Sequence, residues 1–130
     1  MNGAGTLLSV IAISAGASLG ALLRWLLAVR FNPGWTALPL GTLLANLAGG
    51  YLVGLAIGWL GHHPELPPQL RLFVVTGFLG GLTTFSTYSA EVVSHLYEGR
   101  YGPALVVAVT HLAGSLVLTT LGFATARALS

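Results

Sequence analysis

The stretch TGFLGGLTTFSTYS, residues 76–89, lies inside an otherwise apolar segment and combines a glycine cluster with a run of hydroxyl side chains. Gly77, Gly80 and Gly81 relax the steric limits on the backbone, so this stretch is expected to break a helix and free carbonyl oxygens. Within a bilayer, backbone groups without helical partners are tolerated only where protein or a water-filled cavity satisfies them. The stretch therefore predicts a helix break that builds an ion site; a kink that serves only packing is the alternative.

Composition places this stretch in a membrane. The chain has 130 residues, of which 55% are hydrophobic and only 6% charged, and its mean hydropathy is +0.85. Soluble domains carry about 25% charged residues, so this composition indicates an integral membrane protein. Cysteine is absent, which excludes disulfides, thiolate metal sites and cysteine nucleophiles. The few arginines are not clustered, and we therefore expect no nucleic-acid partner.

Four apolar segments, at about residues 5–29, 40–60, 70–97 and 104–126, are separated by short polar or proline-rich stretches. Each meets the length of roughly 20 residues that a spanning helix needs. The third is the longest, and a break near its centre would use its extra residues. The sequence predicts an all-α membrane protein with one four-helix transmembrane domain over residues 1–130 and a break in the third helix.

The arginines give almost no orientation signal. With four spans, Arg71 and Arg127 fall on one side of the membrane, and Arg30, Arg100 and the deeper Arg24 fall on the other. The positive-inside rule needs a larger bias than this. The chain is therefore expected to insert in both orientations, although a weak bias can also fix one. Because four helices barely enclose a pore, an antiparallel homodimer is the expected functional unit.

Aromatic and hydroxyl side chains directly follow the glycines. Phe85 and Tyr88 are three residues apart and share a helix face. Ser86 and Thr87 lie between them and supply hydrogen-bond donors. Ring edges carry partial positive charge, so the group can replace the water around a small anion without a fixed cation. Ordinary core packing of the two rings is the alternative.

Polar residues also interrupt the other helices. Asn46 lies mid-helix, and His111, Ser115 and Thr119 recur every four residues as one stripe. These side chains either line an anion path or serve as interhelical hydrogen bonds and bonds to the preceding turn. Arg24 lies about 9 Å from the end of its helix and either snorkels to the interface or draws anions into a vestibule.

Two further features stay open at this level. Small residues within 16–21 and 41–50 allow close backbone approach, either inside one chain or between subunits. Glu91 lies about two turns after the hydroxyl run and either pairs with Arg24 or faces water, and we assign it no role.

Three blocks of the chain together resemble the Fluc family of small fluoride channels, also called CrcB. They are GASLGALLRW at residues 16–25, GTLLANLAGG at 41–50 and GFLGGLTTFSTYS at 77–89. The resemblance implies an antiparallel dual-topology homodimer with two pores, one structural Na⁺ at its centre and passive fluoride export from the cytoplasm. It also implies the inner (plasma) membrane of a prokaryote as the location, and fluoride, membrane lipid and a second copy of the chain as partners.

The resemblance also assigns roles to residues. Gly80 and Thr83 match the positions whose backbone carbonyls hold Na⁺, and Asn46 matches the pore-lining asparagine. Phe85 matches the first of two paired pore phenylalanines. The other matches are Ser86 and Thr87 between the paired rings, Ser115 on the polar track of the last helix, and Arg24 near the vestibule.

Two positions depart from the family pattern. Tyr88 stands where the second phenylalanine is usual, and His111 stands where the fourth helix more often has tyrosine. We expect Tyr88 to alter conduction rate or anion preference, and His111 to make the path sensitive to pH, because imidazole ordinarily titrates near neutrality.

The alternative function is a small dual-topology drug/proton antiporter, for which Glu91 is the only membrane-embedded carboxylate available. A purely structural subunit would leave the polar stripes without a purpose. An enzyme is disfavoured because the sequence offers no nucleophile–base–acid set and no cluster of metal ligands.

Overall fold

The computed structural model describes residues 2–34 and 37–130, and its regular structure is helical. It contains four helical spans long and apolar enough to cross a membrane: Gly3–Phe31, Leu40–Gly61, Pro68–Tyr97 and Tyr101–Ala128. These bounds lie within a few residues of the sequence prediction. The four-span fold with an interrupted third span is confirmed.

Three spans are continuous helices, named α1 (Gly3–Phe31), α2 (Leu40–Gly61) and α6 (Tyr101–Ala128). The third span consists of α3 (Pro68–Arg71), the π-helix η2 (Leu72–Leu79), the single turn α4 (Gly80–Leu82) and, after a break, α5 (Phe85–Tyr97). Gly99 has φ +70° and ends the turn after α5, a conformation that favours glycine just beyond a helix C-terminus.

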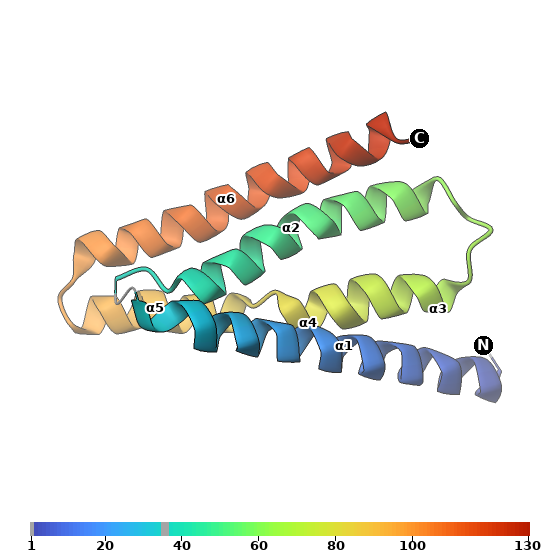
Figure 1. Cartoon of the computed structure of the whole chain (residues 1–130), viewed down its shortest axis with the longest axis horizontal. Helices are drawn as coiled ribbons and strands as arrows, with labels where there is room; N and C mark the ends of the chain where they lie inside the picture. The colour runs from blue at the N-terminus through green and yellow to red at the C-terminus, as the bar shows by residue number, and fades with distance from the viewer. Residues whose placement is uncertain (1, 35–36) are drawn as a thin grey trace.

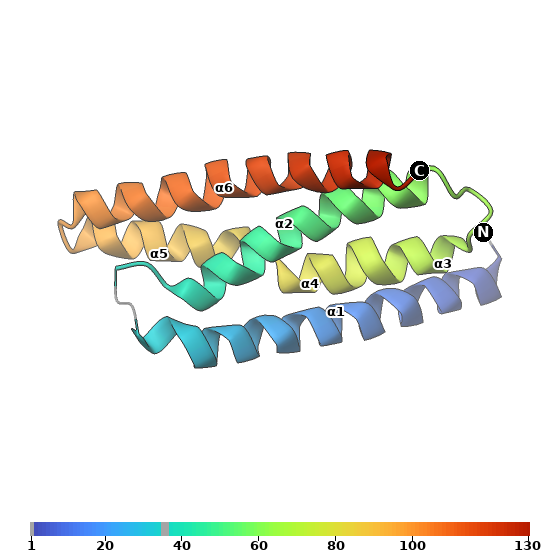
Figure 2. The ribbon, with the colours of Figure 1, turned by 45° about the horizontal axis from the view of Figure 1, so that its top comes forward.

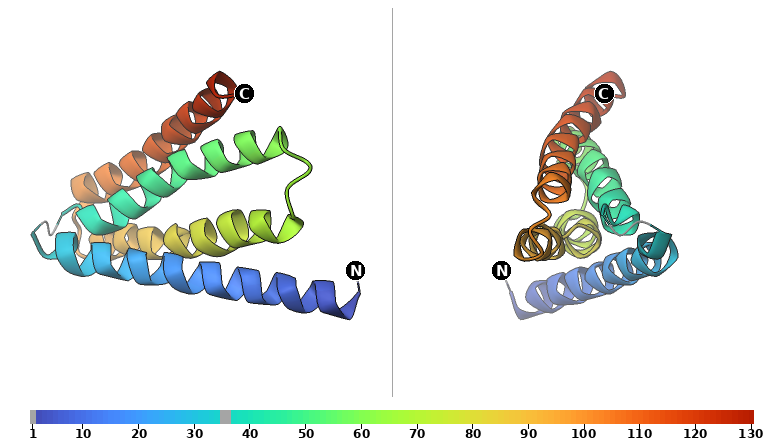
Figure 3. Two further views of the ribbon diagram at one scale, coloured as in Figure 1. Left: turned by 45° about the vertical axis from the view of Figure 1, so that its right-hand side comes forward. Right: turned by 90° about the vertical axis from the view of Figure 1, so that its left-hand side faces the viewer.

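The helices associate in two groups. α2 packs along α6, and α1 packs along η2 and α4, while α5 lies against α6 (Figures 1 and 2). The pair α2–α6 splays away from α1 and α3 toward the end that carries both termini (Figure 3). The broken third span therefore contacts both groups, and α1 also packs directly against α2.

Glycines let α1 approach the third span closely. A Cβ added at Gly16 would meet the Phe73 carbonyl oxygen, and one at Gly77 would lie 3.0 Å from the Gly16 Cα atom. A Cβ at Gly81 would be 3.1 Å from the Ala17 Cα atom. These contacts are too close for side chains that carry Cβ. The small residues of α1 therefore pack within one chain, which was one of the two sequence interpretations.

The break itself lies at two threonines. Thr83 (φ −83°, ψ 151°) and Thr84 (φ −148°, ψ 117°) are extended. The predicted break does occur within this stretch, but at its hydroxyl residues rather than at its glycines, because Gly77, Gly80 and Gly81 lie in helical turns. Gly77 and Gly81 instead allow close packing against the backbone of α1. The Thr84 hydroxyl accepts a hydrogen bond from the Thr87 N–H at 3.1 Å and so caps the restarted helix.

Candidate functional site

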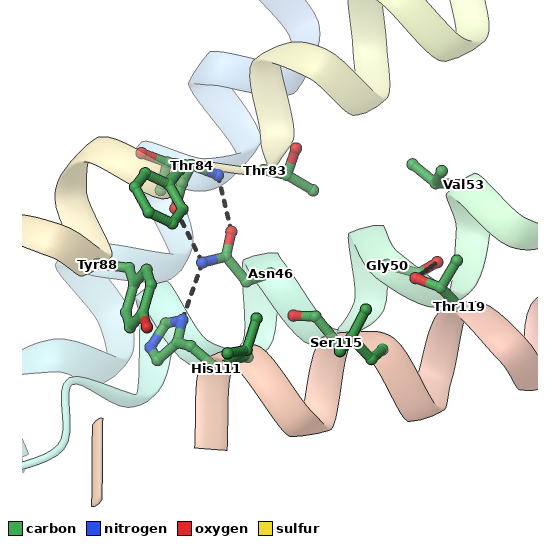
Figure 4. Close-up of a pocket in the computed structure, with 12 residues that line it drawn as sticks. Asn46, Gly50, Val53, Thr83, Thr84, Tyr88, His111, Ser115 and Thr119 are labelled. Carbon is green, nitrogen blue, oxygen red and sulfur yellow. Dashed lines mark hydrogen bonds between the residues drawn. The ribbon is translucent and has the colours of Figure 1, made fainter. Parts of the chain in front are cut away.

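A cavity of about 310 Å³ opens beside the break, between α2, α5 and α6 (Figure 4). Its wall combines apolar side chains with amide, hydroxyl, imidazole and aromatic groups. The lining residues are Asn46, Gly50, Val53, Thr83, Thr84, Phe85, Tyr88, His111, Leu112, Ser115, Leu116 and Thr119. The structure thus brings together most of the polar residues singled out in the sequence.

The Asn46 side chain holds the break in place. Its Oδ1 accepts from the Thr84 N–H at 2.7 Å, and its Nδ2 donates to the Thr84 carbonyl at 2.9 Å (Figure 4). The amide therefore replaces the helical partners that an extended residue loses, as a non-helical segment inside a bilayer requires. Asn46 is 8% exposed; it links α2 to the break and to α6 and also lines the cavity, while its place on an anion path stays a prediction.

These bonds also determine which nitrogen of the neutral His111 ring carries the proton. Asn46 Nδ2 lies 2.9 Å from His111 Nδ1. Because the Thr84 N–H must face the amide oxygen, the atom facing His111 is the NH₂ group, which only donates. His111 Nδ1 is therefore the acceptor, and the neutral ring carries its proton on Nε2. The second hydrogen of the Asn46 amide is thereby used.

The aromatic residues form one stack at the cavity. Tyr88 lies face to face with the His111 ring, with centroids 4.7 Å apart, and meets Phe85 edge to face at 5.4 Å. The Tyr88 hydroxyl donates to the Ala108 carbonyl at 3.2 Å, so it ties α5 to α6. Phe85 is 76% exposed in the single chain, which places its ring at the rim of the cavity.

The predicted stripe on α6 faces the cavity. Thr119 donates across to the Gly50 carbonyl at 2.9 Å rather than to its own preceding turn. The Ser115 hydroxyl makes no hydrogen bond within the described residues, so it keeps a free donor beside the cavity. Ser86 and Thr87 do not line this cavity; their hydroxyls cluster on Thr84 Oγ1 at 3.3 and 3.1 Å.

Arg24 and Glu91 do not pair with each other, contrary to one sequence interpretation. Arg24 Nε donates to the Gly81 carbonyl at 3.0 Å, and the arginine is only partly exposed. Glu91 instead has its Oε2 atom 3.9 Å from His111 Nε2. Thr84 belongs to the hydroxyl run expected to face an anion, but its role as the cap of α5 was not predicted, although a hydroxyl residue directly before a helix is a recognised capping signal.

The break leaves particular carbonyls unbonded. The Leu79 carbonyl accepts from the Thr83 N–H and hydroxyl, and the Gly81 carbonyl accepts from Arg24. Within residues 2–34 and 37–130, no hydrogen bond reaches the carbonyl oxygens of Gly80 and Thr83. A Cβ at Gly80 would have only the Val75 oxygen nearby, at 3.6 Å, so this face of the chain is open.

These features define a small four-span membrane protein with a polar cavity at a broken third helix. The profile of the family described as "CrcB-like protein, Camphor Resistance (CrcB)" matches residues 11–123. The chain belongs to the CrcB family.

Similar proteins cover nearly the whole chain. A protein of Burkholderia cenocepacia strain J2315 named "Fluoride-specific ion channel FluC" is 59% identical over 120 residues, which are 92% of this chain and 94% of the relative. Proteins of the same name from Burkholderia orbicola strain MC0-3 and Burkholderia thailandensis strain E264 are 58% and 57% identical over the same shares.

Proposed function

We propose that this protein is a fluoride-selective channel of the bacterial inner membrane that passively exports fluoride from the cytoplasm. The observation that carries the proposal is the cavity wall, where the polar groups of Asn46, His111, Ser115 and Thr119 lie together without an ionised side chain and the Ser115 hydroxyl keeps a free donor. The similarity to relatives named as fluoride-specific channels supports the choice of ion.

The wall suits a small, strongly hydrated anion. The free hydroxyl of Ser115 donates from one side, and the edge of the exposed Phe85 ring presents partial positive charge from the other. Conduction requires binding that is favourable but still allows escape. Neutral donors and ring edges meet both conditions, since a fixed cation in the wall would hold the ion too strongly.

The functional unit in this proposal is an antiparallel homodimer with two pores. Phe85 is 76% exposed in the single chain, and Gly80 opens onto unoccupied space. A second copy covering this face would bury the ring and enclose the cavity. The nearly balanced arginines allow the two opposite insertions that such a dimer needs.

The same face provides a cation site. The free carbonyls of Gly80 and Thr83, doubled by a second copy, supply four hard oxygen ligands, and Na⁺ is the ion that unwound carbonyls hold in transporter folds. Bound there, the ion would neutralise the carbonyl dipoles at the centre of the dimer. Arg24 occupies the Gly81 carbonyl and so keeps that oxygen out of the ligand set.

Fluoride efflux from liposomes that contain only this protein tests the function. We expect efflux that depends on a potassium ionophore to balance charge, with chloride efflux far slower under the same conditions. Absent fluoride flux, or equal chloride flux, would overturn the proposal. Proton-driven uptake of a cationic drug would instead indicate the antiporter.

The dimer has its own test, because the chain contains no cysteine. With a single cysteine in place of Ser130, a membrane-impermeant maleimide should label about half of the copies in intact cells and all copies after permeabilisation. Labelling of all or none in intact cells would contradict dual topology.

The sodium site is tested separately. Na⁺ is expected to raise the melting temperature of the wild-type dimer by binding only the folded form. Gly80→Ala should lose this effect and dissociate in detergent, while Gly3→Ala, which has open space around the new Cβ, should behave as wild type. A Gly80→Ala dimer that still responds to Na⁺ would remove Gly80 from the site.

A further inference from the structure

Buried polar atoms without a hydrogen bond occur on α5 and α6, and two of them, on Glu91 and His111, lie 3.9 Å apart. Among the described residues, the buried side-chain atoms without a hydrogen bond are Glu91 Oε2, His95 Nδ1 and His111 Nε2. His111 is 2% exposed and His95 is 4% exposed. Buried polar groups normally have partners, so three such atoms on the facing helices α5 and α6 call for a functional explanation.

The hydrogen-bond network makes His111 the central member. Its Nδ1 accepts from Asn46 Nδ2 at 2.9 Å, and its protonated Nε2 points toward Glu91 Oε2, 3.9 Å away. That separation exceeds a hydrogen bond but allows strong attraction between charges across a buried gap. Only Nδ1 of the ring is therefore free to take up a proton.

We propose that a proton taken up from solution by His111 Nδ1 turns the contact between His111 and Asn46 into an anion-binding site. With both ring nitrogens protonated, the Nδ1–H and the Asn46 N–H become two donors that converge at 2.9 Å in place of a donor and an acceptor. Asn46 cannot turn its oxygen toward the ring without giving up the Thr84 N–H. If the two side chains separate, a small anion can accept from both donors and each regains a hydrogen bond. Fluoride then binds together with one proton, and this inference rests on the proposed function.

Two neighbouring groups on α5 offset part of the cost of placing a charge on the buried His111 ring. On α5, Glu91 faces Nε2, His95 lies one turn beyond Glu91, and Tyr88 stacks on the ring at 4.7 Å. A carboxylate and an aromatic face both stabilise a nearby cation. α2, the other helix packed against α6, carries Tyr51 as its sole ionisable side chain, and Tyr51 is bonded to Thr125 near the far end of α6.

A charged donor holds an anion more firmly than a neutral one. Hydrogen bonds to an ionised group are roughly twice as strong as neutral ones, which corresponds to about fivefold tighter binding here. Because conduction needs escape as well as entry, the saturating fluoride current should fall about fivefold in acid, and half-saturation should occur at about fivefold lower fluoride.

Electrical recording in planar bilayers tests this directly, because neutral hydrogen fluoride crosses lipid without carrying current. Currents are measured against fluoride concentration at about pH 7.5 and about pH 5.5, which span most of the range where imidazole ordinarily titrates. His111→Gln keeps an acceptor for Asn46 but cannot titrate, so its current should not depend on pH. His95→Gln should retain the wild-type response, and Glu91→Gln should shift that response to lower pH.

The outcomes separate the two proposals. A wild-type fluoride current that is independent of pH overturns the proton-linked site and leaves the channel intact. A pH response that persists in His111→Gln, or that is lost in His95→Gln, also overturns the proton-linked site and leaves the channel intact. Absence of fluoride current at either pH overturns the channel itself and the site with it.

A measurement on the wild-type protein guards against misfolded variants. By reciprocity, a proton that tightens fluoride binding requires fluoride to increase proton uptake. Calorimetric fluoride titrations near pH 6, in buffers with different ionisation enthalpies, should reveal uptake of up to one proton per bound ion. Zero uptake would overturn the site, and chloride serves as the control anion.

Discussion

Replacing Asn46 by aspartate puts the proposed anion path to a quantitative test. Aspartate has nearly the same shape and can still accept the Thr84 N–H at Oδ1. Its second oxygen, however, faces two acceptors, the Thr84 carbonyl and His111 Nδ1, each 2.9 Å from the present Nδ2. The substitution therefore removes the bond to the Thr84 carbonyl, keeps the bond to His111 only if the ring carries a proton on Nδ1, and adds a negative charge to the cavity wall.

The added negative charge should reduce transport more than the loss of hydrogen bonds does. A carboxylate about 4 Å from a fluoride ion repels it by about 4 kcal/mol at an effective dielectric constant near 20. Since about 1.4 kcal/mol is a factor of ten, fluoride occupancy and flux should fall about a thousandfold. The assay is fluoride efflux from liposomes at about pH 7.5, above the range where imidazole ordinarily titrates.

A matched control separates charge from position. Asn2→Asp adds the same charge in the same protein, but at the N-cap of α1, where aspartate caps as well as asparagine. Its flux should stay within about twofold of wild type. If Asn46→Asp protein remains folded, as judged by size exclusion and helicity, and still conducts at the wild-type rate, Asn46 does not lie on the path.

Two predictions concern the fold. Gly20→Ala would place a Cβ against the Phe78 carbonyl oxygen, and because the backbone must move to make room, we expect a loss of at least about 1–3 kcal/mol of stability. Gly3→Ala, with open space around the new Cβ, is the control. An unchanged melting temperature of Gly20→Ala in detergent would refute the close packing. Thr84→Val removes the cap that accepts the Thr87 N–H and should cost about 1 kcal/mol, whereas Thr84→Ser should recover most of it. Equal melting temperatures for the Val and Ser variants would show that the cap contributes nothing.

The four spans could be predicted because hydropathy and helix length are properties of the chain alone. The location of the break in the third span was also predictable, since glycines and hydroxyls interrupt an apolar segment there. Its cause was not. Glycine suits both a freed backbone and a close helix contact, and only the position of α1 shows that Gly77 and Gly81 serve contact.

Which residues far apart in the chain contact each other could not be predicted from the sequence. The polar stripe on α6 followed from helical periodicity, but that pattern does not give the bond between His111 and Asn46, 65 residues apart. Glu91 had two candidate partners, and its approach to His111 depends on how α5 restarts after two extended threonines. The Na⁺ ligands, the dimer and the pore roles of these residues remain predictions.

The way the helices interleave also constrains how the protein is made. α1 has its main neighbour in η2, and α2 has its main neighbour in α6, so each helix of the first hairpin depends on the second half of the chain. During synthesis the N-terminal hairpin therefore enters the bilayer with its glycine-rich faces uncovered. These two helices can therefore complete their packing only after η2 and α6 have been synthesised.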